Sequence, residues 1–173
     1  MLTRNRYALK EWETACDRLA RGEDVLVLRK GGILERREGF RLEHREFFLF
    51  PTRFHEQDAA PPDRVDLRLY ASVEEDLAVG DLESLRRLEG MHALPWEDVE
   101  RRFHYGREKG VHAVVLRTWK LARPQTIGNA RAYDGCRSWV ELREELAVEP
   151  AEPALADAAF DAKRRAVRDA LHG

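Results

Sequence analysis

VLVLRKGGILERREGFRLEHREFFLFPTRFH, residues 25–55, is the stretch of sequence that decides how the fold is interpreted. Its apolar runs VLVL and FFLF are typical of strands, because such side chains pack well on a pleated surface. Gly31 and Gly32 lie between the two runs and favour a tight turn or a bulge. The stretch therefore predicts a hairpin, and its many charged residues make it the predicted working surface.

The second predicted strand, residues 40–50, changes phase along its length. Phe40, Leu42 and His44 fall on one face, but four apolar residues follow Glu46 in succession. Because side chains alternate strictly along a strand, this shift predicts a break or a bulge near residues 45–46. Pro51 has no N–H group and is expected to end the pairing.

The remaining sequence predicts helices and strands in separate groups. Helices are expected at 7–22, at 82–88 after the N-cap Asp81, at 96–105 and at 154–172; strands are expected at 64–73, 111–121, 124–127 and 138–142. The first helix is inferred from the spacing of Leu9, Trp12, Cys16 and Leu19, and the last has a thin apolar stripe at Leu155, Ala159, Ala166 and Ala170. This order favours an α+β fold with a small mixed or antiparallel sheet. We expect a single domain over 1–148, then a linker and a C-terminal helix over 149–173.

Charge is distributed unevenly along the chain. Residues 1–55 carry 12 basic and 9 acidic side chains, residues 56–100 carry 4 and 13, and residues 101–146 carry 10 and 5. If the two basic segments meet, they form a face that attracts phosphate; otherwise these are solvated faces that pair with each other. The acidic segment 56–100 and the C-terminal helix are candidate surfaces for a protein partner.

Bulk composition excludes several classes of protein. The net charge of −2 argues against a broadly basic nucleic-acid-coating protein, and two cysteines are too few for a disulfide framework. The first residues, MLTRNRYALKEW, contain no signal-like apolar run, and no stretch reaches the ~20 apolar residues of a membrane span. The expected location is the cytoplasm, without a membrane partner.

Candidate anion-binding residues cluster around the predicted hairpin. Glycines allow backbone N–H groups to approach a phosphate, and arginine supplies a forked donor. The alternative is a plain turn with surface cations. Arg117 lies among strand apolar residues and must pair with something, either a carboxylate such as Glu11 or Glu43 or a ligand anion. The candidates are Arg29, Lys30, Gly31, Gly32, Arg41, Arg45, Thr52, Arg53 and Arg117.

Four of the polar residues are candidates for catalysis: Glu43, His44, His55 and Lys30. His44 is either a satisfied core histidine or a general acid or base, since histidine titrates near neutral pH. Nothing fixes three ligands at zinc spacing, so no metal site is predicted. Mg²⁺ would be needed only by a nuclease.

Four blocks in the same order resemble a bacterial domain-of-unknown-function family, number 1802 in that series. They are ALKEW at 8–12, LRKGGI at 28–33, FLFPT at 48–52 followed by His55, and GCRSW at 135–139. The resemblance covers residues 7–146 and leaves the tail after Glu149 outside. It implies kinship without a known activity.

A more distant resemblance is to the PUA-like barrels, especially the ASCH and EVE branches, which bind RNA or modified bases. It implies a partly closed barrel flanked by helices. The ASCH motif has the form GxKxxExR; Gly22 and Arg29 match its ends, whereas Asp24 and Val27 replace its Lys and Glu. The resemblance therefore extends to the barrel rather than to ASCH-type catalytic residues. The element order is also similar to PD-(D/E)XK nucleases, but Glu43-x-Arg45 lacks their lysine.

Three functions remain open from the sequence. The first is binding of RNA, DNA or a nucleotide-like anion through the basic hairpin face. The second is a hydrolase, either a nuclease or a base-modification amidohydrolase, and the third is a non-enzymatic protein-interaction module. The site is expected at the strand ends, where residues 29–32, Thr52 and His55 come near Arg117.

Overall fold

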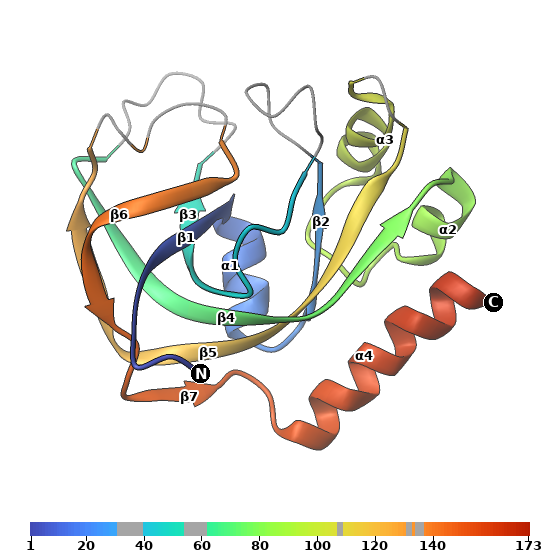
Figure 1. Ribbon diagram of the computed structural model, residues 1–173. Coiled ribbons are helices and arrows are strands. Elements are labelled where there is room, and N and C mark those ends of the chain that lie inside the picture. The colour runs from blue at the N-terminus through green and yellow to red at the C-terminus, as the bar shows by residue number, and fades with distance from the viewer. Residues whose placement is uncertain (31–39, 54–61, 107–108, 131–132, 134–136) are drawn as a thin grey trace.

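The computed structural model describes residues 1–30, 40–53, 62–106, 109–130, 133 and 137–173, and shows a strongly curved sheet with helices around it (Figure 1). In chain order the elements are β1 (Arg4–Trp12), α1 (Glu13–Ala20), β2 (Leu26–Arg29), β3 (Glu46–Thr52), β4 (Arg64–Val79), α2 (Leu82–Arg87), α3 (Trp96–His104), β5 (Val111–Gly128), β6 (Trp139–Ala147), β7 (Ala151–Pro153) and α4 (Asp157–His172).

The described strands form one seven-stranded sheet with the order β2-β5-β4-β3-β1-β6, and β7 pairs with β5. The β1–β3 pair is parallel and the other pairs are antiparallel. The sheet curves without closing into a barrel. The predicted α+β fold with a mixed sheet and a C-terminal helix is therefore confirmed.

The two longest strands, β4 and β5, pair with each other along most of their length, and α2 and α3 lie in the connection between them (Figure 1). β5 is one strand of 18 residues that joins the two predicted segments. The predicted N-cap is also confirmed, because the Asp81 side chain accepts a hydrogen bond from the Ser84 N–H at 2.7 Å. A cap of this kind typically contributes ~1 kcal/mol to helix stability.

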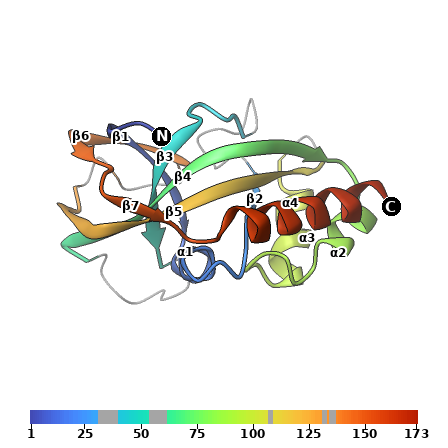
Figure 2. The same ribbon diagram turned by 90° about the horizontal axis from the view of Figure 1, so that it is seen from below.

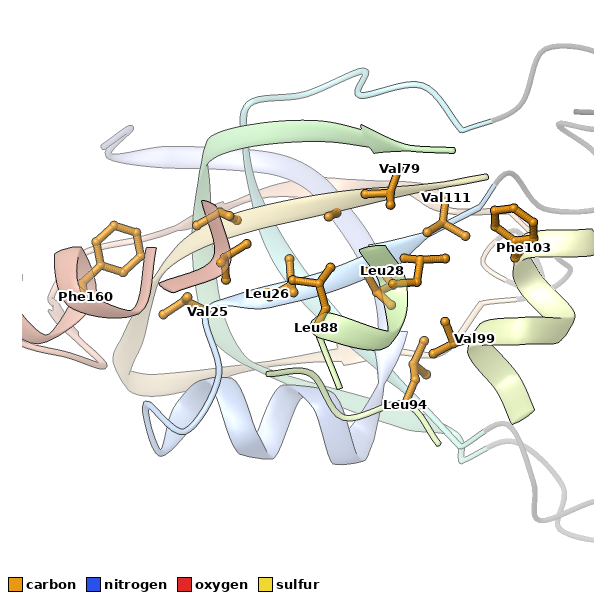
Figure 3. Packing of buried hydrophobic residues seen from close by; sticks show 14 residues of the cluster. Val25, Leu26, Leu28, Val79, Leu88, Leu94, Val99, Phe103, Val111 and Phe160 are labelled. Atoms are coloured by element: carbon orange, nitrogen blue, oxygen red, sulfur yellow. The ribbon is translucent and has the colours of Figure 1, made fainter. Parts of the chain in front are cut away.

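Apolar side chains cover both faces of the sheet. On the outer face, Leu26, Leu28 and neighbouring strand residues pack beneath α2, α3 and α4 (Figure 3). On the inner face, Val27 packs in a second cluster that includes Cys16 and Leu19 of α1. Successive residues of β2 thus point to opposite faces and are all buried. This explains why β2 has an unbroken apolar sequence rather than an alternating one.

The prediction of a helix over residues 7–22 is wrong for its first half. β1 occupies Arg4–Trp12, and the helix begins only at Glu13. Because β1 lies between β3 and β6 with both faces covered, consecutive residues such as Ala8 and Leu9 are both fully buried. The helical spacing from Leu9 to Leu19 runs across a strand–helix junction and is coincidental.

The predicted hairpin is also wrong, because its two strands do not pair with each other. β2 pairs with β5, whereas β3 pairs with β4 and β1. Both strands need apolar partners on both faces, and those partners come from distant parts of the chain. The predicted break at residues 45–46 is confirmed, since β3 begins at Glu46. Pro51 does not end the pairing, which continues to Thr52 opposite Trp12.

The tail is attached to the domain by a strand and a helix. Residues 151–153, expected to be linker, form β7 along β5, and α4 then packs through Phe160 and Val167. Figure 2 shows α4 running alongside α2, and the Arg87 guanidinium donates to the carbonyl of Ala170 at 2.6 Å. Of the expected stripe, Leu155 and Ala170 pack against the cluster, whereas Ala159 and Ala166 are exposed and the adjacent, larger Phe160 and Val167 are buried instead. Among the described residues, no helix has the length and apolarity needed to cross a membrane.

Candidate functional site

The curvature of the sheet brings the end of β2 next to β1. The Arg29 Nη1 atom donates to the carbonyl of Lys10 and to Glu11 Oε2, each at 2.9 Å. The side chains of Arg29 and Glu11 are only 9% and 3% exposed. In the described residues no backbone hydrogen bond joins β2 to β1, so this buried ion pair bridges them. We call the junction of β2 and β1 at Arg29 and Glu11 the seam.

Glu11 is held from three directions. Its Oε2 accepts from Arg29, its Oε1 accepts from the Trp12 N–H at 2.9 Å, and its carbonyl accepts from Thr52 Oγ1 at 3.1 Å. The carboxylate is therefore fixed by β1 and β2, and the backbone of Glu11 is fixed by the end of β3. The Arg29 Nε atom, in contrast, is buried without a hydrogen-bond partner among the described residues.

Four aromatic rings extend from the seam in a continuous row. The Arg29 guanidinium lies 5.5 Å from the centroid of Phe40, and the Phe40 ring stacks on Trp139 at 6.5 Å. Trp139 meets His44 edge to face at 5.1 Å, and His44 stacks on Tyr7 at 3.6 Å with an interplanar angle of 12°. Phe40 is buried, whereas the other three are partly exposed. We call Phe40, Trp139, His44 and Tyr7 the aromatic row.

His112 adds an imidazole beside the seam. It lies opposite Arg29 in the β2–β5 register, and its ring meets Phe40 edge to face at 5.5 Å. Its Nδ1 atom is 2.7 Å from Asp76 Oδ1 of β4. The carboxylate therefore orients the imidazole, and both side chains are partly exposed.

Further cations approach the seam from α3 and β2. Arg102 Nη1 donates to the carbonyl of Leu28 at 2.8 Å, and its guanidinium lies 5.3 Å from the Trp12 ring. Burial lowers the pKa of Arg102 to about 10; Glu11 acts against this shift, and Arg29 adds to it. Lys30 Nζ donates to the carbonyl of Gly110 at 2.6 Å.

The structure gathers part of the predicted anion-binding set at one end of the sheet. Arg29, Lys30 and Thr52 lie at or beside the seam through the contacts given above. Arg41 and Arg45 are exposed, and their carbonyls accept from Trp139 Nε1 and the Val73 N–H respectively. Arg53 is exposed and pairs with Glu13 at 2.8 Å. Gly31, Gly32 and His55 lie outside the described residues.

Arg117 lies away from the seam, beneath α4. Its Nη2 atom is 2.5 Å from Asp157 Oδ1, and its guanidinium lies 4.8 Å from the Phe160 ring. The ion-pair partner is thus neither Glu11 nor Glu43. The prediction that Arg117 comes near Arg29 is wrong, because Arg117 points to the outer face, against Asp157 and Phe160, while Arg29 points to the inner face, against Glu11.

The predicted catalytic residues do not form a contact network in the described part of the chain. Glu43 is exposed, and Lys30 is bound to Gly110. His44 is stacked in the aromatic row; burial lowers its pKa, and Glu43 and Glu141 oppose that shift. No three His, Cys, Asp or Glu side chains in the described ranges are placed to hold a metal ion.

Sequence reasoning missed several residues that the structure places at this end of the sheet. Glu11 was assigned to a helix, and His112 and Arg102 carried no local signal. Residues 4–12 show no clean alternation, because both faces of β1 are covered, so there is no clear strand signal in the sequence around Glu11. Arg102 and Leu28 are 74 positions apart, so only the fold brings them together.

Comparison with known proteins gives a family and a fold. Residues 8–166 match the family model described as "Domain of unknown function (DUF1802)". The structure is similar to that of a serine-to-alanine mutant of ASCH from Zymomonas mobilis, with 18% identity, 83% of this chain and 92% of that chain covered, and a TM-score of 0.50. For a tyrosine-to-phenylalanine mutant of the same protein, the identity is 18%, the coverage 80% and 90%, and the TM-score 0.50. No curated protein matches.

The family match confirms the resemblance to the DUF1802 family, and the structural matches confirm the ASCH-like fold. The family match extends further than expected. It continues through residue 166, so β7 and much of α4 belong to the matched region rather than lying outside it.

Proposed function

This chain belongs to the DUF1802 family, and we propose that it binds single-stranded nucleic acid at the seam and along the aromatic row. The ASCH structures support the fold alone, so the proposal rests on the site. The main support for this proposal is that the seam and the aromatic row are continuous. The Arg29 guanidinium lies against Phe40, which is the first ring of a row that reaches the surface at Tyr7.

The aromatic row has the properties of a base-stacking surface. Every nucleobase has a π face, so stacking on protein rings is tolerant of sequence and contributes about 1–3 kcal/mol per base. Trp139, His44 and Tyr7 are partly exposed, and their mutual ring contacts fix their orientations. A preorganised row loses little side-chain entropy when a ligand stacks on it.

Exposed arginines supply the charge that such a ligand requires. Arg41 and Arg45 precede β3 and flank His44 in sequence, and both are exposed. Phosphate contacts of this kind release counterions, so the affinity falls as salt rises. The basic segments identified in the sequence would then act through this end of the sheet rather than through a uniformly positive surface.

The test is a binding titration with short fluorescent RNA and DNA strands over a salt series. We expect the Kd to rise steadily with salt and the Trp139→Leu variant to bind about tenfold more weakly, as loss of one stacking surface predicts. Trp96→Leu is the matched control, because Trp96 lies on α3 against Arg86 and outside the row. Thermal unfolding of both variants separates lost stacking from lost folding.

Absent binding, salt-independent binding, or equal losses in the two tryptophan variants would each contradict the proposal. Binding to double-stranded and single-stranded probes with equal affinity would also count against it, because paired bases cannot stack on protein rings.

A further inference from the structure

We propose that Arg29 and Arg102 form a binding site for a terminal phosphate, which takes the phosphorylated end of the strand that the aromatic row binds. This inference rests on the proposed function, and it concerns a residue, Arg102, that the sequence did not single out. The ligand class is a phosphate monoester at a strand end or on a mononucleotide.

The contacts of Arg102 place it beside the buried ion pair. Its Nη1 atom binds the carbonyl of Leu28, the residue before Arg29. Its guanidinium covers the ring of Trp12, the residue after Glu11. Arg102 therefore reaches the seam from α3, next to both members of the pair.

The charges at the seam do not balance within the described residues. Arg29, Lys30 and Arg102 carry three positive charges, and Glu11 and Asp76 carry two negative charges. Glu11 Oε2 already accepts from Arg29 and Oε1 from the Trp12 N–H. No carboxylate in the described part of the chain lies within ion-pair distance of Arg102. A partly buried cation without a counterion is costly, and a bound anion would offset that cost.

Free donor capacity is present at the same place. Arg29 is 7% exposed, and its Nε atom has no hydrogen-bond partner among the described residues. A guanidinium fork matches the tetrahedral oxygens of phosphate, and two forks suit a group with several oxygens. The site therefore combines a buried N–H donor without a hydrogen-bond partner among the described residues, a second guanidinium and an excess of positive charge.

The depth of the site favours a strand end over an internal phosphodiester. An internal phosphodiester is flanked by nucleotides on both sides, whereas the Arg29 side chain is only 9% exposed and is reached more easily by the end of a strand. A terminal monoester also carries about −1.5 to −2 charges at neutral pH, against −1 for an internal diester. The monoester therefore presents more charged oxygens to the two guanidiniums than a diester does.

The experiment compares two RNA strands of the same sequence, one with a 5′-phosphate and one with a 5′-hydroxyl, and repeats the comparison with a 3′-phosphate. We expect one phosphorylated form to bind wild type about tenfold more tightly than its hydroxyl counterpart, as one to two charge-assisted hydrogen bonds imply. In Arg102→Met, this preference should disappear while binding of the hydroxyl strand is retained.

Arg101→Met is the matched control, because Arg101 is the neighbouring α3 residue, is exposed and pairs with Asp98. It should keep the preference for the phosphorylated strand. Arg102→Lys keeps the charge without the fork and should reduce the preference partly. This variant also covers the case in which the methionine variant fails to fold.

The outcomes separate the two proposals. Equal binding of phosphorylated and hydroxyl strands by wild type overturns the terminal-phosphate site and leaves nucleic-acid binding intact. If neither strand binds, but inorganic phosphate raises the Tm of wild type and not of Arg102→Lys, nucleic-acid binding fails and the anion site stands. An unchanged preference in both Arg102 variants overturns the assignment of Arg102.

Discussion

The molecule contains two arginine–carboxylate pairs in which the guanidinium also lies over a phenylalanine ring. They are Arg29–Glu11 with Phe40 at the seam and Arg117–Asp157 with Phe160 beneath α4. The arginines are similarly buried, but the Glu11 side chain is 3% exposed and the Asp157 side chain is 94% exposed. The two pairs therefore share their chemistry and differ in the surroundings of the carboxylate.

That difference determines what each pair contributes. An exposed carboxylate is well solvated without its partner, and such pairs are typically worth about 0–1 kcal/mol. Removal of a buried carboxylate leaves its arginine uncompensated in a medium of low dielectric, which costs about 3–5 kcal/mol. The exposure of the acidic partner, rather than the distance between the charges, thus indicates which pair the fold depends on.

The largest expected effect is at the seam. Glu11→Gln should lower the free energy of unfolding by about 3–5 kcal/mol, because Arg29 then lies buried without a counterion. Denaturant titration measures this change. Glu13→Gln is the control, since Glu13 pairs with the exposed Arg53, and it should change stability by less than ~1 kcal/mol. Similar losses in the two variants would remove the distinction between the buried pair and an exposed one.

The next largest effect is expected at α4, where apolar contacts should contribute more to the free energy of unfolding than the Arg117–Asp157 ion pair does. Phe160→Ala should cost about 3 kcal/mol, because a buried ring that anchors α4 to the sheet is lost. Hydrogen exchange should show α4 losing protection before the strands. Ala166→Ser, on the exposed side of α4, is the control. Retained protection of α4 in Phe160→Ala would show that charged contacts alone hold the helix.

A smaller effect is expected in the pH dependence of stability, to which His44 near the seam should contribute and α4 should not. Burial lowers the pKa of His44 below its ordinary value of 6.5. The unfolded chain therefore takes up the proton first, so the contribution of His44 to stability is complete above pH 6.5 and is lost as the pH falls through the folded-state pKa. The free energy of unfolding, measured from about pH 7.5 to 5.5, should fall less in His44→Phe than in wild type. His172→Gln, at the exposed end of α4, should follow wild type; identical slopes in all three proteins would contradict this role for His44.

The smallest effect should come from the exposed acid of the tail pair. Asp157→Asn should change the free energy of unfolding by less than ~1 kcal/mol, because water replaces the carboxylate at an exposed position. Denaturant titration in low and high salt checks this value. A loss comparable to that of Glu11→Gln would refute the comparison between the two pairs.

Local patterns predicted most elements correctly. The cap at Asp81, the helix after Pro95, the long strand from Val111 and the break before Glu46 all depend on signals within a few residues. The pairing of strands was not predictable in the same way. β2 and β3 have apolar sequences because both of their faces are buried, and such sequences do not specify which strand lies alongside.

The residues of the candidate site divide in the same way, into those that local sequence predicts and those that only the fold brings together. Arg29, Lys30 and Thr52 were identified from their own neighbourhoods, next to glycines and at strand ends. Glu11 is 18 positions from Arg29, and Arg102 is 74 from Leu28, so their roles depend on the curvature of the sheet. Arg117 was correctly expected to need a partner, but that partner, Asp157, lies in a helix that was expected to follow a linker outside the domain.

The seam also differs from the rest of the sheet in what holds its strands together. Every other neighbouring pair of strands is held by a ladder of backbone hydrogen bonds, whereas in the described residues the side chain of Arg29 connects β2 to β1. Separation of β2 from β1 therefore disrupts the buried ion pair rather than a ladder of backbone hydrogen bonds, so the free energy of local opening there depends on the few contacts of Arg29. A fluctuation of this kind would expose the Arg29 guanidinium to solvent, because its contacts with Lys10 and Glu11 are the ones that break.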